Sequence, residues 1–160
     1  MNRKMWILGL LFLGAGCVRI DAPLPAAARG HAAPAGAVQV DTTCILPAGG
    51  PAVERGVLVA RLYEYDAQQA DAQAREIGRT TLPGIFHRPG EISAVRFVVN
   101  GRAMDAMAHY LTVVVYPEGA PAGQSGLYRL DGFRRVLASG NREALTAPLA
   151  PVPEEDGPSN

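Results

Sequence analysis

The chain has 160 residues, in which 15 Lys and Arg residues balance 15 Asp and Glu residues. This length provides for one modest domain, because two domains would each be too small to bury a core. The balanced charge gives no electrostatic attraction to nucleic acid, so we expect no nucleic-acid partner.

Residues 1–16 predict a cleaved signal peptide. Arg3 and Lys4 precede the apolar stretch "MWILGLLFLGAG" (5–16), which is the layout of an export signal. At about 1.5 Å per residue this stretch is too short to remain as a helix across a hydrocarbon core of about 30 Å. As a buried core helix it would lack the polar face that packing on a small domain requires.

Cys17 is the predicted lipidation site. The small residues Gly14, Ala15 and Gly16 precede it, which resembles the lipobox of bacterial lipoproteins, although Gly14 stands where that motif usually has leucine. Two alternatives are open. One is cleavage at the alanines 26–28, far from the apolar stretch. The other is a disulfide between Cys17 and Cys44 in a secreted, soluble chain.

Lipidation at Cys17 leaves Cys44 as a lone thiol, which we expect to be a small buried side chain. Val18 follows Cys17, where Gram-negative lipoproteins kept at the inner membrane tend to have aspartate. By that resemblance the chain is anchored by lipid in the periplasmic face of the outer membrane. Several acyl chains on one cysteine give a firm anchor.

The segments that flank the predicted domain are rich in proline. Residues 17–36, which contain "VRIDAPLPAAARGHAAPAG" after the lipidated Cys17, have no hydrophobic period and predict a flexible tether. Residues 151–160, "PVPEEDGPSN", predict a disordered acidic tail. The folded domain is therefore expected to span residues 37–150.

Alternation of apolar and polar residues dominates this domain. Four segments rich in β-branched and aromatic residues predict strands, namely Val38–Leu46, Gly56–Tyr65, Glu91–Val99 and His109–Pro117. Weaker strand patterns cover Glu76–Leu82, Leu127–Leu130, Phe133–Ala138 and Glu143–Leu149. Short strands separated by Gly and Pro predict a small all-β fold, which we expect to be an antiparallel β-sandwich of about seven strands.

The sequence allows more specific structural predictions for two segments of the domain. The Phe97 face of the strand Glu91–Val99 is expected to be the core face, with Arg96 pointing outward. The segment Asp66–Glu76 contains a capping residue and good helix formers, and predicts a short helix or a loop over one end of the sandwich.

Motifs that carry catalytic chemistry are largely absent from the sequence. The sequence contains no nucleophile elbow, phosphate loop, zinc-protease helix or paired C-x-x-C motif. We therefore expect no enzyme activity, no cofactor and no metal. The alternative is a small periplasmic hydrolase or metal-binding enzyme that uses Glu64, Asp66, His87 and His109.

The segment "LYEYDAQQAD" allows two interpretations. The carboxylates of Glu64 and Asp66 beside Tyr63 and Tyr65 could bind a cation or a sugar. Ordinary strand geometry explains the same residues, with both tyrosines on one face, Glu64 on the other and Asp66 capping the turn. We favour the strand interpretation.

The lipobox-like start, the tether and a β domain that opens with "GVLVARLYEYD" (56–66) together resemble the YbaY/YscW group of bacterial lipoproteins, which includes pilotin-like chaperones of type III secretion. The loop at Gln69–Asp71 and the later strand "YLTVVVY" (110–116) are also similar. The resemblance implies an outer-membrane lipoprotein that acts as a binding or assembly module, with an envelope protein or an acyl chain as its ligand. It implies no catalysis.

Overall fold

The computed structural model describes residues 36–69, 71, 73–104, 107–121, 123–136 and 142–153, apart from the side chain of Arg142. All of them belong to one compact unit, Ala32–Asn160. The described ranges contain no helix of the length and apolarity needed to cross a membrane. The predicted signal peptide (1–16), the lipidation site Cys17, the tether up to residue 35 and the tail from residue 154 lie outside the described residues.

The described residues form eight strands and no helix, which confirms the predicted all-β class. The strands are β1 (Ala37–Leu46), β2 (Val53–Tyr65), β3 (Arg75–His87), β4 (Ser93–Arg102), β5 (Ala108–Pro117), β6 (Tyr128–Leu130), β7 (Arg134–Val136) and β8 (Arg142–Pro151). The segment predicted as a short helix or loop is a turn and loop in its described part, and β3 begins at Arg75, just inside its end.

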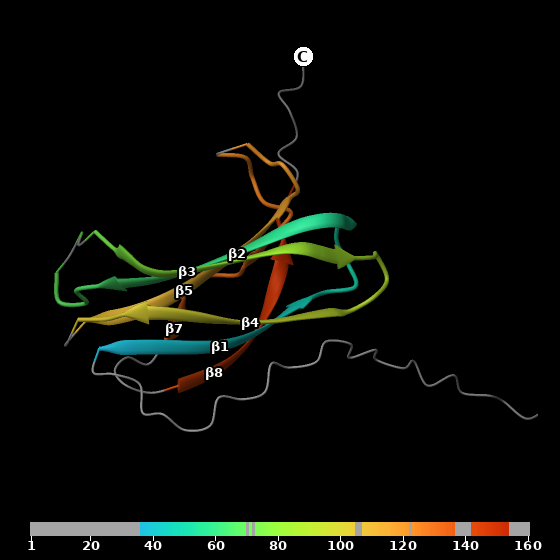
Figure 1. The fold of residues 1–160 in the computed structure, drawn as a ribbon. Coiled ribbons are helices and arrows are strands. Elements are labelled where there is room, and N and C mark those ends of the chain that lie inside the picture. The colour runs from blue at the N-terminus through green and yellow to red at the C-terminus, as the bar shows by residue number, and fades with distance from the viewer. Residues whose placement is uncertain are drawn as a thin grey trace, which may run out of the picture. The chain divides into compact units, whose positions relative to one another are not determined.

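The strands follow one another in a single sheet with the order β3-β2-β5-β6-β8-β1-β4, and β7 pairs with β5. In Figure 1, β2 and β3 lie above β1 and β4, and β8 (red) passes from one side to the other. Residues 142–148 of β8 pair with β1 and residues 149–151 pair with β6. The pairing of β1 with β8 is parallel, whereas the other pairings are antiparallel.

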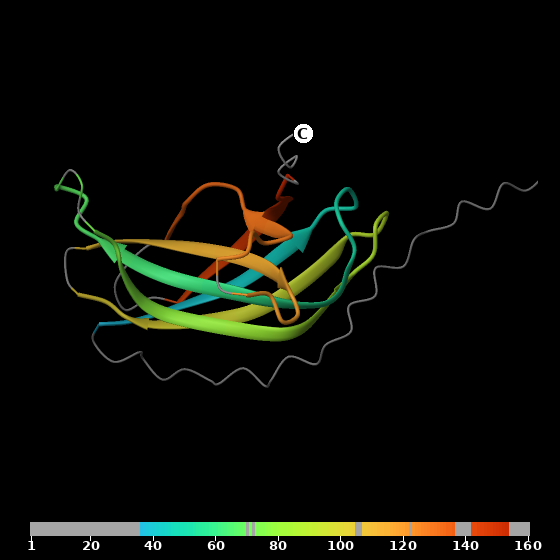
Figure 2. The same cartoon turned by 90° about the horizontal axis from the view of Figure 1, so that it is seen from above.

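The arrangement therefore refines the predicted sandwich, because two opposed layers are joined through β8 into one nearly closed sheet. Its two edge strands, β3 and β4, run along the same side of the unit (Figure 2). Among the described residues they share no backbone ladder. The hydroxyl of Thr80 on β3 donates to the carbonyl oxygen of Val98 on β4, at 2.6 Å. We call this meeting of β3 and β4 the seam.

Apolar side chains at alternate positions of the strands form the core. Leu46, Leu58, Leu62 and Leu111 are fully buried, as is Cys44. Burial raises the pKa of the Cys44 thiol to about 12, and Cys44 is a free cysteine, as predicted for a structural thiol. Removing so much apolar surface from water is the main source of stability for a fold of this size.

The prediction of which face of β4 lies in the core is confirmed. Phe97 is 7% exposed and lies in the core with Val99, while Arg96 is exposed on the opposite face. The favoured interpretation of the end of β2, with both tyrosines on one face and Glu64 on the other, is confirmed as well. Glu64 is fully buried, Tyr63 and Tyr65 point to the outer face, and the Asp66 carboxylate accepts a hydrogen bond from the backbone N–H of Gln68 at 2.9 Å.

Candidate functional site: the outer face of β2 and β5

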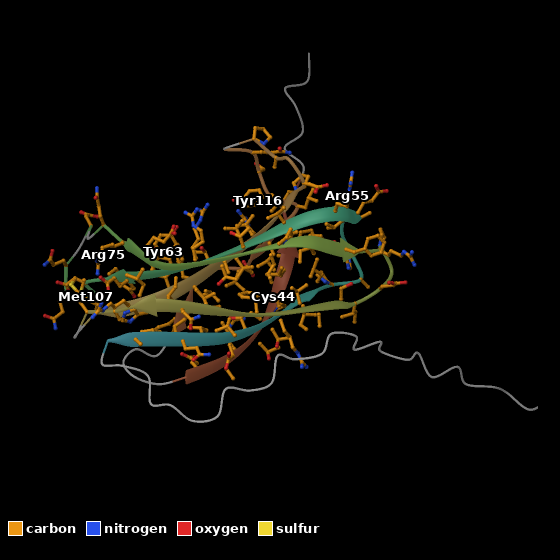
Figure 3. All side chains as sticks on the ribbon, in the orientation of Figure 1. Cys44, Arg55, Tyr63, Arg75, Met107 and Tyr116 are labelled. Carbon is orange, nitrogen blue, oxygen red and sulfur yellow. The ribbon has the colours of Figure 1, made fainter. Side chains whose placement is uncertain are left out.

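Two of the four residues of the alternative enzyme site lie close together. Pairing of β2 with β5 places Glu64 opposite His109, and Nε2 of His109 lies 3.9 Å from Oε2 of Glu64. Arg75 at the start of β3 donates to Oε1 of Glu64 from Nε at 2.8 Å and also from Nη2, and the backbone N–H of Met104 donates to Oε2 at 3.0 Å. Figure 3 shows Arg75 and Met107 at this end of the sheet and Arg55 at the other.

The charges of this buried pair follow from its surroundings. Burial by itself would raise the pKa of Glu64, but the hydrogen bond from Met104 and the nearby Arg75 and His109 hold that pKa below its ordinary value. Burial lowers the pKa of His109, against the attraction of Glu64. Neither ring nitrogen of His109 has a hydrogen-bond partner among the described residues. At neutral pH the pair is thus a carboxylate held by Arg75 beside an uncharged imidazole.

The other two residues lie elsewhere. His87 pairs with Val53 at the opposite end of β2 from Glu64. Its Nδ1 lies 2.9 Å from the hydroxyl of Ser93, and its ring packs edge-on against Tyr128 with centroids 5.5 Å apart. The Asp66 carboxylate accepts a hydrogen bond within the turn that follows β2. The four residues do not converge, and the described residues contain no cluster of three or more His, Cys, Asp or Glu side chains suited to a metal ion.

A groove in the described residues lies on the outer face of the sheet, over β2 and β5. Its floor is formed by Val57, Val59 and Tyr116, and it has a volume of about 340 Å³. Arg61 closes one end, and the loop after β5 forms the wall. The wall residues are Pro117, Gly119, Ala120, Pro121 and Gly123. We call this feature the β2–β5 groove.

Aromatic side chains continue the same face beyond Arg61. The rings of Tyr63 and Tyr110 stack with centroids 5.1 Å apart, and Tyr65 packs edge-on against Tyr110 at 5.7 Å. Phe133 packs edge-on against the same ring at 5.0 Å and is 78% exposed. Burial, with Tyr63 and Tyr65 beside it, raises the pKa of Tyr110, so its hydroxyl is uncharged at neutral pH. We call these four residues the aromatic cluster.

Arginines border this face on both sides. On the β3 side, Arg79 donates two hydrogen bonds to Glu76, at 2.8 and 2.9 Å, and this contact holds the pKa of Glu76 below its ordinary value. Pairing of β5 with β6 and β7 places Arg129 opposite Val114 and Arg135 opposite Tyr110. Arg61, in the middle, has its Nε 3.8 Å from Glu76, too far for a hydrogen bond.

Neither the groove nor most of the aromatic cluster was predicted from the sequence. A signal was present, because "VLVA" in β2 and "VVVY" in β5 are apolar at consecutive positions and therefore on both faces of the strand. Strands of this kind are buried on both sides. Such a pattern indicates that the outer face is to be covered as well as the inner one.

Comparison with protein-family models and with curated proteins found no match. Among solved structures, this chain is similar to an alternative pilotin from the type II secretion system of Vibrio cholerae, with a TM-score of 0.54 and 13% sequence identity. The match covers 74% of this chain and 99% of the pilotin chain. The two proteins therefore share a fold.

Proposed function

We propose that this chain is a lipid-anchored protein of the cell envelope that binds a partner protein and assists its assembly, and that it catalyses no reaction. The observation that carries the proposal is the likeness of the fold to a pilotin over 99% of that chain. The resemblance of the sequence to the YbaY/YscW lipoproteins points to the same role. The lipobox-like residues before Cys17 support the anchor, and Val18 after it supports the periplasmic face of the outer membrane.

The chemistry of the described residues favours binding over catalysis. Glu64 and His109 are both fully buried, so a substrate has no access to them. The accessible face instead presents apolar and aromatic side chains bordered by arginines. Aromatic residues and arginine are the side chains that protein interfaces favour, and they supply contact area and charge without reacting.

An acyl chain is the other ligand that the family resemblance implies. Buried side chains of the core occupy the space that the sheet encloses, whereas the β2–β5 groove lies outside it. A protein partner accounts for the groove and for the arginines together.

The anchor is tested by replacing Cys17 with serine and following the chain by cell fractionation and by labelling with radioactive palmitate. We expect Cys17→Ser to lose the label and to leave the membrane fraction. Cys44→Ala is the matched control, because it also removes one thiol and should keep both properties. Unchanged membrane association of Cys17→Ser would overturn the lipid anchor.

The assembly role is tested in a strain that lacks the chain. The expected result is that an envelope protein of a secretion system fails to assemble in the outer membrane and that the wild-type chain restores it. Normal assembly of every such protein in the deletion strain would overturn this role and leave the anchor untouched.

A further inference from the structure

The β2–β5 groove and the aromatic cluster form one strip along β2. The outward positions of this strand are Val57, Val59, Arg61, Tyr63 and Tyr65, and they pass from the groove into the cluster without interruption. From the first to the last the strip measures about 27 Å, at roughly 3.4 Å per residue. An extended peptide of about eight or nine residues has this length.

The middle of the strip holds a donor that lacks an acceptor. Nε of Arg61 is buried, has no hydrogen-bond partner among the described residues and lies 3.8 Å from the Glu76 carboxylate, which Arg79 already binds. A ligand does not reach this buried atom, but the Arg61 side chain is 35% exposed and lines the groove, so the accessible part of its guanidinium can receive a carboxylate of a partner. Arg129 and Arg135 add positive charge along the side of the strip that borders β6 and β7. Neither arginine takes part in the ion pairs of the described residues.

The aromatic cluster supplies the second part of the recognition chemistry. Tyr63 and Tyr110 form a stacked pair, and Phe133 stands beside them with most of its surface in water. Grooves lined by aromatic rings bind proline-rich segments, because the polyproline conformation is already extended and loses little entropy on binding.

We propose that this strip binds an extended, acidic and proline-containing segment of a partner protein, with a carboxylate of that segment on Arg61. Apolar side chains of the segment then fill the β2–β5 groove, and its proline and aromatic side chains pack against the aromatic cluster. The charge of the bordering arginines selects an acidic segment over a basic one. The inference rests on the proposed binding role and names the chemistry of the partner.

An anionic membrane surface is the competing ligand, since arginines and tyrosines also occur where proteins meet lipid headgroups. The shape of the site argues for a peptide. A concave groove with a wall formed by Pro117, Gly119, Ala120, Pro121 and Gly123 accepts a narrow chain, whereas a lipid surface is broad and lies against protruding side chains.

The test is a nuclear magnetic resonance titration of the full chain in detergent. The probe is a synthetic peptide of about nine residues, which matches the length of the strip. It alternates Glu and Pro around a central Phe. The same peptide with Lys in place of Glu is the matched probe. We expect saturable shifts of the backbone amides of Val57, Val59, Arg61 and Tyr63 with the acidic peptide, and no binding of the basic one.

Two pairs of variants locate the site. Arg61→Gln should raise the dissociation constant about tenfold by removing a charge-assisted hydrogen bond, while Arg96→Gln, on the exposed face of β4, should leave it unchanged. Phe133→Ala should raise it about fivefold, while Ile92→Ala, at a similarly exposed apolar residue, should not. Both substituted residues of the strip keep exposed surface, so the variants should fold.

Three results would overturn the inference. The first is that the basic peptide binds as tightly as the acidic one, and the second is that the amide shifts are confined to other strands. The third is that the acidic peptide does not bind, whereas phosphatidylglycerol vesicles do and Arg61→Gln abolishes their binding. None of these results touches the palmitate labelling of Cys17 or the assembly of an envelope protein in the deletion strain. Failure of the peptide site can therefore be distinguished from failure of the proposed function.

Discussion

The carboxylate of Glu64 and the imidazole of His109 face each other 3.9 Å apart, and both side chains are completely buried. The carboxylate is held by Arg75 and by the backbone N–H of Met104, while the imidazole has no hydrogen-bond partner among the described residues. The pair joins β2 to β5 at one end of the sheet and fixes the start of β3 and the segment after β4 against them.

Glu64→Gln should destabilise the fold, because a neutral amide loses the charge that Arg75 and Met104 bind. We expect a loss of about 2 kcal/mol in the free energy of unfolding, measured by urea denaturation. Arg75 is 59% exposed, so water screens part of its attraction and the bond from Met104 contributes much of the effect. Glu76→Gln is the control, because it removes the partner of Arg79 at the surface and should cost less than about 1 kcal/mol. Equal losses in the two variants would contradict this account.

Stability should fall as the pH falls, in two stages. The pKa of His109 is lowered from 6.5 in the native state, so the unfolded chain takes up a proton first and stability is lost below that pH. The pKa values of Glu64 and Glu76 are lowered from 4.5, so their contribution is present above pH 4.5 and is lost as the pH falls below it. Urea denaturation at a series of pH values measures both stages.

His109→Leu should remove the first of these stages. Because neither ring nitrogen has a partner among the described residues, we expect an apolar side chain of similar size to leave stability at neutral pH unchanged or higher. The fall in stability just below pH 6.5 should then be smaller than in the wild-type chain. A slope as steep as that of the wild type would assign the first stage to another group.

The thiol of Cys44 should be unreactive in the folded chain. It is fully buried and its pKa is raised to about 12, and alkylating reagents attack the thiolate. In a Cys17→Ser background, we expect iodoacetamide to label the chain in urea and not in its absence. Rapid labelling of the folded chain would mean that the core around Cys44 opens easily.

Gly78→Ala should open the seam between β3 and β4. A Cβ at this position would collide with the carbonyl oxygen of Asn100, which is backbone and cannot turn aside. We expect a loss of about 1–3 kcal/mol and faster amide hydrogen exchange in β3 and β4. Gly49→Ala is the control, because a Cβ there meets no atom within 4 Å. Equal exchange in both variants would show that the seam tolerates a wider spacing.

Local patterns predicted much of the fold. Alternation placed Phe97 in the core and Arg96 outside, and it turned Glu64 inward between two outward tyrosines. These are properties of one strand at a time, with a period of two residues that the sequence displays directly. The position of each strand beside its neighbours has no such local signature.

The features that escaped prediction depend on pairing between distant strands. Glu64 meets His109 only through the register of β2 and β5, and Phe133 joins the aromatic cluster because β7 pairs with β5. His87 and Glu64 lie at opposite ends of β2, because β3 pairs with β2 in antiparallel register and brings His87 beside Val53. The sequence does not display this register, so the hypothesis that joined the two residues in one site is wrong. The strip on β2 could be found only after the strands were placed.

The parallel pairing of β1 with β8 has a consequence for the order of events in a cell. Gln39 pairs with Arg142, so the first strand of the domain lacks one of its two neighbours until the last strand has been synthesised. Contacts so distant along the chain form slowly. The sheet can therefore join its two layers through β8 only after that strand has been synthesised, and until then one edge of β1 is unpaired.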